Sequence, residues 1–197
     1  MSRESFDDTW LTEMPENIGD FELFDMLEYH IKDRLKHTSK VSLGDNWFKM
    51  GNEVVSYWYE KNGEILLAAE FDVKPQSYVV NSVGKKYKGS MPYASDLYNR
   101  VLKDTHKSIR IMSDVQLSNE GFSIWERLID QGHSISVYNK NEPGRSFKIL
   151  NKNDLKKYHQ ADTDFRKYQF IISESSYINE TAAVFGTRRM RELTGRI

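Results

Sequence analysis

The sequence contains no cysteine, which excludes disulfide bonds, cysteine-ligated metal sites and cysteine nucleophiles. It lacks any apolar run near the roughly 20 residues of a membrane-spanning helix, and its acidic first ten residues lack the apolar segment of a secretory signal. The five histidines show no HxxxH or HExxH spacing, and no Walker loop or G-x-S-x-G elbow occurs. These absences disfavour metal catalysis, NTP hydrolysis and serine-hydrolase chemistry. We expect a cytoplasmic protein with no membrane partner.

The composition suits a packed domain, but the charge is unevenly distributed. Apolar residues make up 39% and aromatic residues 13% of the 197 residues. Residues 1–35 hold ten acidic and three basic side chains, whereas residues 181–197 hold four arginines and one glutamate. We expect this basic tail to dock on the acidic arm or on a second copy of the chain, which would make a homodimer. Nucleic acid is the less favoured partner, because the pI is near 6.5.

The first half of the sequence predicts one helix followed by a run of strands. Apolar residues recur every three or four positions over residues 18–35, which predicts an amphipathic helix beginning near Asp20. Residues 39–46 are expected to form a loop. Alternating and β-branched segments predict strands of an antiparallel meander, with a tight turn at Asn62 and Gly63; these strands cover residues 47–50, 54–60, 65–73 and 77–83.

A basic loop follows the meander and leads into a helix. The loop, residues 86–91, contains three basic or small residues that suit phosphate binding: Lys86, Lys88 and Gly89. Ser90 is expected to cap the helix and Pro92 to occupy its first position. A glycine-containing loop at a helix start offers backbone N–H groups and a positive dipole end to a phosphate.

The next segment predicts a second helix between two strands. A strand is expected at residues 109–112, and a helix begins after the capping residue Ser118 and stops at Gly132. Trp125 shares one face of that helix with apolar neighbours, so we predict that it is a core residue. Further strands are expected at residues 135–137, 147–150 and 165–173, and a short helix at 154–159. Together these elements predict an α/β (α+β) fold, a mixed sheet with helices on its faces.

This order of elements resembles the cofactor-binding half of the GNAT acyltransferase superfamily. In that family an Arg/Gln-x-x-Gly-x-Gly/Ala loop holds the pyrophosphate of coenzyme A. The matching residues here are Lys86, Tyr87, Lys88, Gly89, Ser90 and Met91. Met91 stands where a second small residue is usual, and Pro92 removes one backbone donor. The resemblance implies a GNAT-like, mainly antiparallel sheet with an N-terminal helix and a C-terminal extension, and acetyl-coenzyme A or another acyl-coenzyme A as cofactor.

The second predicted helix is similar to a family helix whose tyrosine protonates the leaving thiolate. Here Ile124 and Trp125 occupy the Leu-Tyr place, and an indole N–H cannot supply that proton. The pattern Ser113-Asp114, Leu117-Ser118 and Ile124-Trp125 resembles phage-type relatives, so the chain is identified as a divergent phage-type member. A phage origin would place the protein in the host cytoplasm.

Asp114 and Ser113 are the catalytic candidates. They follow a predicted strand at its C-terminal end, where open sheets place ligands. A carboxylate at that point can deprotonate an amine or bind a cationic substrate; the alternative is a turn or capping role before Ser118. Glu70 is a second candidate base if it faces a cleft, and is otherwise expected on the surface.

These observations divide the chain into three parts and leave two functions open. The parts are an acidic arm and helix (residues 1–45), a GNAT-like core (46–140), and C-terminal strands with a basic tail (141–197) that belong to the same domain. The first function is an acyl-coenzyme A-dependent acyltransferase acting on an amine of a protein, small molecule or modified nucleobase. The second is a catalytically inactive GNAT-fold phage protein that binds and modulates a host macromolecule.

Overall fold

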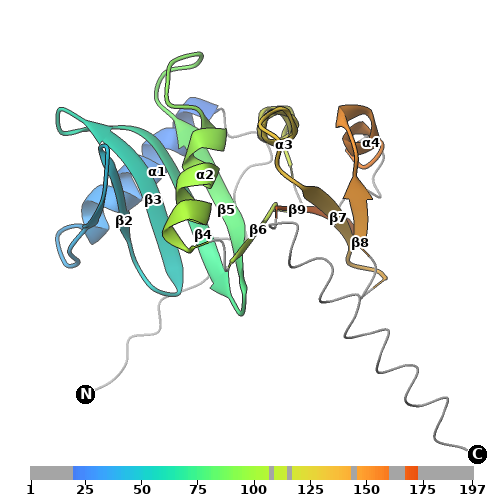
Figure 1. Cartoon of the computed structure of the whole chain (residues 1–197). Helices are drawn as coiled ribbons and strands as arrows, with labels where there is room; N and C mark the ends of the chain where they lie inside the picture. The colour runs from blue at the N-terminus through green and yellow to red at the C-terminus, as the bar shows by residue number, and fades with distance from the viewer. Residues whose placement is uncertain (1–19, 107–108, 115–116, 143–145, 160–166, 173–197) are drawn as a thin grey trace, which may run out of the picture.

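A computed structural model of the chain describes residues 20–106, 109–114, 117–142, 146–159 and 167–172. They form a nine-stranded sheet in the order β1-β2-β3-β4-β5-β6-β9-β7-β8, with helices on its faces (Figure 1). Within this part, β5 and β6 form the parallel pair and the other paired strands are antiparallel. The predicted fold class, a mixed and mainly antiparallel sheet flanked by helices, is confirmed. The acidic arm (residues 1–17) and the basic tail lie outside the described residues.

The elements follow the predicted order with one addition. The strands are β1 (Val41–Gly44), β2 (Trp47–Met50), β3 (Val54–Lys61), β4 (Glu64–Lys74), β5 (Ser77–Lys85), β6 (Arg110–Met112), β7 (Ile135–Asn139), β8 (Ser146–Ile149) and β9 (Tyr168–Ile172). The helices are α1 (Asp20–Arg34), α2 (Ala94–Asp104), α3 (Asn119–Asp130) and α4 (Lys152–Lys156). None of the helices described is long and apolar enough to cross a membrane.

The prediction of a loop at residues 39–46 is wrong, because Val41–Gly44 form strand β1. It pairs with β2 through a two-residue turn in which Asp45 and Asn46 both have positive φ, 53° and 64°. Positive φ at both central residues is typical of hairpin turns whose twist matches the strands. Asn62 and Gly63 show the same feature, so the predicted turn between β3 and β4 is confirmed. The strand was missed because it has only four residues, too few for a pattern to be significant, and because as an edge strand it is mostly exposed.

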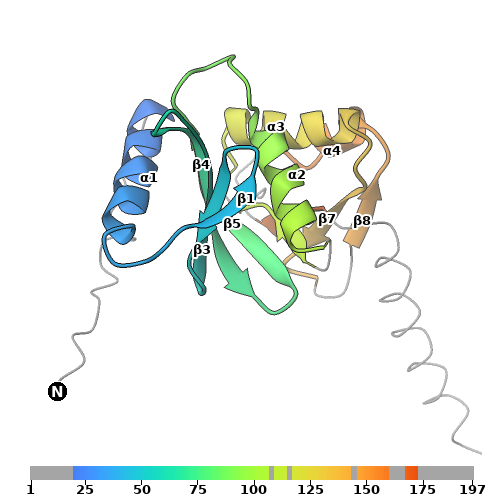
Figure 2. The same ribbon diagram turned by 60° about the vertical axis from the view of Figure 1, so that its left-hand side comes forward.

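Helix α1 covers one face of the meander and α2 covers the other, with α3 packed beside α2 (Figure 2). On the α1 face Phe24, Leu27 and Ile31 are buried against Trp58 and Ala68 of the sheet. The contact is close at Gly84 of β5, where a Cβ atom would stand 2.9 Å from the Cα of Phe24. Glycine at this position therefore lets α1 approach the strand that also forms a wall of the cleft described below.

We expect Gly84→Val to destabilise the protein. The added side chain must push α1 away from β5, and overpacking of this kind costs about 1–3 kcal/mol. The loss should grow from Gly84→Ala to Gly84→Val and can be measured by urea denaturation. Equal stability of wild type and the valine variant would show that α1 does not dock here as closely as described.

The expectation that Glu70 lies at the surface is also wrong, because its side chain is buried. Its side chain lies on the α1 side of the fold, where its Oε1 accepts hydrogen bonds from Ser56 Oγ at 2.9 Å and from Arg34 Nη1 at 3.3 Å. Arg34 also donates to the carbonyl oxygen of Val54 at 2.9 Å. The carboxylate is satisfied by these partners, so it serves to join α1 to β3 and β4.

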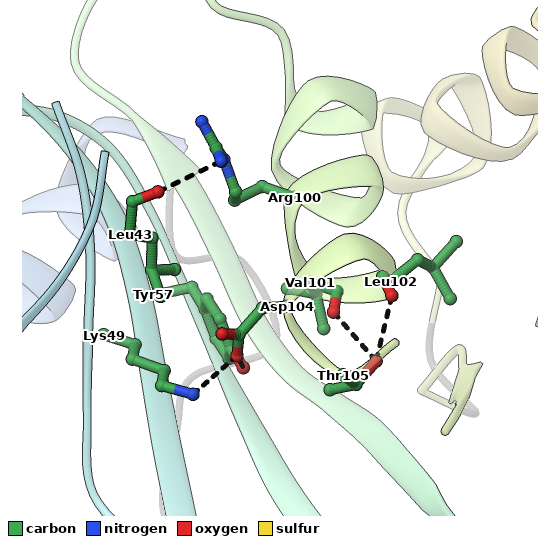
Figure 3. Close-up of polar contacts among 8 residues, drawn as sticks. All are labelled: Leu43, Lys49, Tyr57, Arg100, Val101, Leu102, Asp104 and Thr105. Atoms are coloured by element: carbon green, nitrogen blue, oxygen red, sulfur yellow. Dashed lines mark hydrogen bonds and ion pairs between the residues drawn. The ribbon is translucent and has the colours of Figure 1, made fainter. Parts of the chain in front are cut away.

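A polar network fixes the C-terminal end of α2 to the meander (Figure 3). Asp104 accepts hydrogen bonds from the Tyr57 hydroxyl at 2.7 Å and from Lys49 Nζ at 2.6 Å. Near the middle of the helix, Arg100 donates to the carbonyl oxygen of Leu43 at 3.2 Å and pairs with Asp45. These bonds hold α2 across β1, β2 and β3, and so set the position of its N-terminal half.

Strands β5 and β6 pair only at their beginnings. Ser77–Val79 of β5 pair with Arg110–Met112 of β6, and from Val80 onward this edge of β5 has no strand partner among the described residues. The register against β4 shifts at Asn81, an extra residue in β5 that forms a β-bulge. Beyond β6 the sheet continues through β9, which lies between β6 and β7. The sheet therefore divides next to Val80.

Candidate functional site

A cleft of about 750 Å³ lies where β5 separates from β6. One wall is the second half of β5 from Val80 and the loop at Lys88 and Gly89, and the other is the end of β6 with α3. Between these walls lie the N-cap residue Tyr93 and the first two turns of α2, which include Tyr98. Its size suits a small-molecule ligand. The unpaired edge of β5 offers it backbone N–H and C=O groups.

Two cations lie against one aromatic ring at the loop end of the cleft. The guanidinium carbon of Arg127 stands 3.3 Å from the centroid of the Tyr93 ring, and Lys85 Nζ stands 4.9 Å from it. Lys85 also donates a hydrogen bond to the carbonyl oxygen of Ser90. Burial lowers the pKa of Lys85, an effect that Asp96 opposes and Arg127 reinforces. This end of the cleft is therefore suited to an anion.

The structure places two of the six predicted cofactor-binding residues at the cleft. Lys88 and Gly89 line the cleft, and Gly89 has φ +77° in open space. Lys86 instead pairs with Glu64 at 2.6 Å, and the Tyr87 hydroxyl donates to the same carboxylate at 3.3 Å. The remaining two residues are Ser90, whose carbonyl holds Lys85, and Met91, which is 74% exposed. Their role in binding a cofactor stays a prediction.

The start of α2 differs from the expected one. The helix begins at Ala94, so Ser90 and Pro92 precede it rather than cap it. The Asp96 carboxylate accepts a hydrogen bond from the Tyr93 amide at 2.7 Å and satisfies the helix end in their place. Because a carboxylate already stands at the positive end of the helix dipole, binding of an anion there depends more on Lys85 and Arg127.

Ser113 and Asp114 both line the cleft, as predicted from their place after a strand. Ser113 is 1% exposed, and its hydroxyl accepts from the Phe170 amide at 2.9 Å and donates to the Asp114 carbonyl at 2.8 Å. Its own carbonyl accepts from Gln169 Nε2 at 2.9 Å. Ser113 thus joins β6 to β9, whereas Asp114 is half-buried at the cleft. A catalytic role for either residue stays a prediction.

Trp125 is fully buried, which confirms the prediction that it belongs to the core. Its ring packs against Tyr98 and Phe170, with centroids 6.0 and 5.7 Å away. Its Nε1 is the one enclosed side-chain polar atom without a hydrogen-bond partner in the described part of the chain. Tyr98, which lines the cleft, is also buried, and burial raises the pKa of its phenol.

Sequence reasoning did not select four residues of this site, Lys85, Tyr93, Tyr98 and Arg127. Lys85, Lys86 and Lys88 belong to one basic run, and composition alone does not show which of them points into the cleft. The two tyrosines look like ordinary core positions of a helix. Across the described ranges, no group of three or more histidine or acidic side chains is placed to hold a metal ion.

The order and pairing of the elements form the mixed, mainly antiparallel sheet flanked by helices that the sequence predicts. No protein-family model matches the sequence, and no curated protein matches it. Among solved structures, the ribosomal-protein-S18-alanine N-acetyltransferase from Escherichia coli is similar at 14% identity and a TM-score of 0.38, over 80% of this chain and 89% of that chain.

Proposed function

We propose that this protein is an acyl-coenzyme A-dependent acyltransferase that acts on an amine. The observation that carries the proposal is the cleft where β5 parts from β6, with cations at the loop end and an unpaired strand edge further in. A coenzyme A thioester has the matching chemistry, a polyphosphate at one end and an amide-containing arm that leads to the thioester. The fold and the Gly89 loop support the same assignment.

The residues of the cleft would bind and orient the donor. Lys85, Lys88 and Arg127 would hold the phosphates, and backbone groups of β5 beyond Val80 would pair with the amides of the arm. When bound, the cofactor supplies an activated acyl group. Backbone N–H groups next to the bulge at Asn81 would polarise the acyl carbonyl. Asp114, at the end of β6, would accept the proton that the amine loses.

Two neighbouring lysines provide a matched test of this proposal. By isothermal titration we expect acetyl-coenzyme A to bind wild type, and Lys85→Ala to weaken binding about 10- to 100-fold, because one charged contact is worth about 1.5–3 kcal/mol. Lys86→Ala removes the same charge from a residue that pairs with Glu64, and should change affinity less than threefold. Lack of binding by wild type would contradict the proposal, and equal losses in both variants would contradict the assignment of Lys85.

The second candidate function is a GNAT-like binding protein without catalysis. One observation favours it: α3 presents the buried Trp125 at the place of the family's acidic tyrosine. Thiol release from acetyl-coenzyme A in the presence of a panel of amines separates the two candidates. Binding of the cofactor without thiol release for any amine class would support the binding protein.

A further inference from the structure

The segment that begins with α4 and ends at His159 runs antiparallel along α3. Three contacts, one for each helical turn, join the two: Lys152 with Asp130 at 2.5 Å, Lys156 with Glu126 at 3.7 Å, and the ring of His159 with that of Phe122 at a centroid distance of 4.0 Å. Side chains three or four positions apart lie on one face of a helix, so both partners advance together from one contact to the next. The His159 contact is the last of the three and falls on the first turns of α3, next to the cleft.

His159 also holds the chain just before α3. Its Nε2 lies 3.2 Å from the carbonyl oxygen of Leu117. A carbonyl oxygen can only accept, so Nε2 carries the proton and donates it. Leu117 precedes the N-cap residue Ser118 and lines the cleft, and its side chain lies over the first turn of α3, where a Cβ at Gly121 would stand 3.1 Å from its Cδ1. One imidazole therefore contacts both the helix and the residue that leads into it, which fixes the angle at which the chain enters α3.

Asp114 lies between two anchors that come from the C-terminal part of the chain. On one side Ser113 is bonded to Phe170 and Gln169 of β9. On the other side Leu117, three residues after Asp114, is bonded to His159. The position of the Asp114 carboxylate at the cleft therefore depends on both anchors.

We propose that His159 is a positioning residue, which holds Asp114 in place for the amine through the carbonyl group of Leu117. This inference rests on the proposed acyltransferase function, in which Asp114 accepts the proton that the amine loses. The phosphates of the donor are assigned to Lys85, Lys88 and Arg127, at the other end of the cleft. His159 therefore acts on the amine side of the reaction and leaves binding of the donor unchanged.

Two variants separate the hydrogen bond of His159 from its ring. His159→Phe keeps the stack on Phe122 and loses the donor, whereas His159→Gln keeps an N–H donor of similar reach and loses the ring. The probe is the amine that gives the fastest thiol release with wild type. We expect His159→Phe to lower kcat/KM for this amine about 10- to 100-fold, because a small misplacement of a reacting group is costly. His159→Gln should recover most of the loss, and both variants should bind acetyl-coenzyme A with wild-type affinity, which also shows that they are folded.

A second measurement reports on position 114 without any reaction of the cofactor. The chain contains no cysteine, so Asp114→Cys introduces a single thiol. Alkylation of this thiol by iodoacetamide should be about 3- to 10-fold faster when His159→Phe is added, which is the factor that one hydrogen bond provides. Adding His159→Gln instead should leave the rate close to that of Asp114→Cys alone.

Tyr158→Phe is the matched control, because it removes a hydroxyl from the neighbouring residue and keeps the ring that contacts Phe147 and Tyr168. It should change neither kcat/KM nor the alkylation rate. If His159→Phe fails to lower kcat/KM or to speed alkylation, or weakens acetyl-coenzyme A binding by the same factor as kcat/KM, the positioning role is overturned and the proposed function stands. If wild type releases no thiol with any amine, the acyltransferase function is overturned, and this role with it.

Discussion

Replacing Trp125 with alanine is expected to lower the free energy of unfolding by about 3–5 kcal/mol, the range for a fully buried tryptophan whose removal leaves a cavity. Trp125 is 0% exposed and contacts rings from α2 and β9, so its loss separates elements that are distant in sequence. Denaturation in urea measures the change.

Two further variants make this expectation sharper. Ser123→Ala changes an exposed position on the same helix and should stay within about 0.5 kcal/mol of wild type. Trp125→Phe keeps an aromatic ring and removes the unpartnered N–H, so it should cost less than Trp125→Ala. An alanine variant with unchanged stability but lost cofactor binding would contradict the structural role and place Trp125 in the site.

Stability is expected to fall steeply above pH 10. Burial raises the pKa of Tyr57 and Tyr98 in the folded protein, and for Tyr57 the hydrogen bond to Asp104 adds to this effect. In the unfolded chain both phenols return to a pKa of about 10. As the pH rises, the unfolded state therefore loses these protons first. The free energy of unfolding keeps its full value below pH 10 and then falls by about 1.4 kcal/mol per pH unit for each phenol.

Urea denaturation between pH 9 and 11.5 measures this dependence. Tyr98→Phe should reduce the slope, because the phenylalanine variant has one fewer buried phenol. Tyr29→Phe is the control, since Tyr29 is 67% exposed and should leave the slope unchanged. Equal slopes in all three proteins would show that the buried phenols do not control the alkaline limit.

The two ends of α3 and the turn between β3 and β4 were predicted from local chemistry, whereas the start of α2 was not. The Ser118 hydroxyl accepts from the Gly121 amide at 3.0 Å, as expected of an N-cap, and Gly132 ends α3 with φ +85°. The identity of Asn62 and Gly63 alone predicted the turn between β3 and β4. Such features depend on neighbours within a few positions, so the sequence contains all of the information that they need.

The edge strand and the buried acid were not predicted, because both depend on distant partners. β1 is a strand because β2 offers it hydrogen bonds, whereas its own four residues are too few to predict one. Glu70 is buried since Arg34, which is 36 positions away in the sequence, reaches it from α1. Neither partner can be identified from the local sequence.

The sequence by itself determined the class of fold, the order of the elements and a basic, glycine-containing loop beside a helix, because periodicity and turn residues are local properties. Only the tertiary structure decided that Lys85 and Lys88 line the cleft while Lys86 pairs with Glu64, and that Arg127 and Lys85 meet at the ring of Tyr93. These facts follow from the separation of β5 and β6 and the packing of α2 against α3, which bring side chains from distant segments into one space.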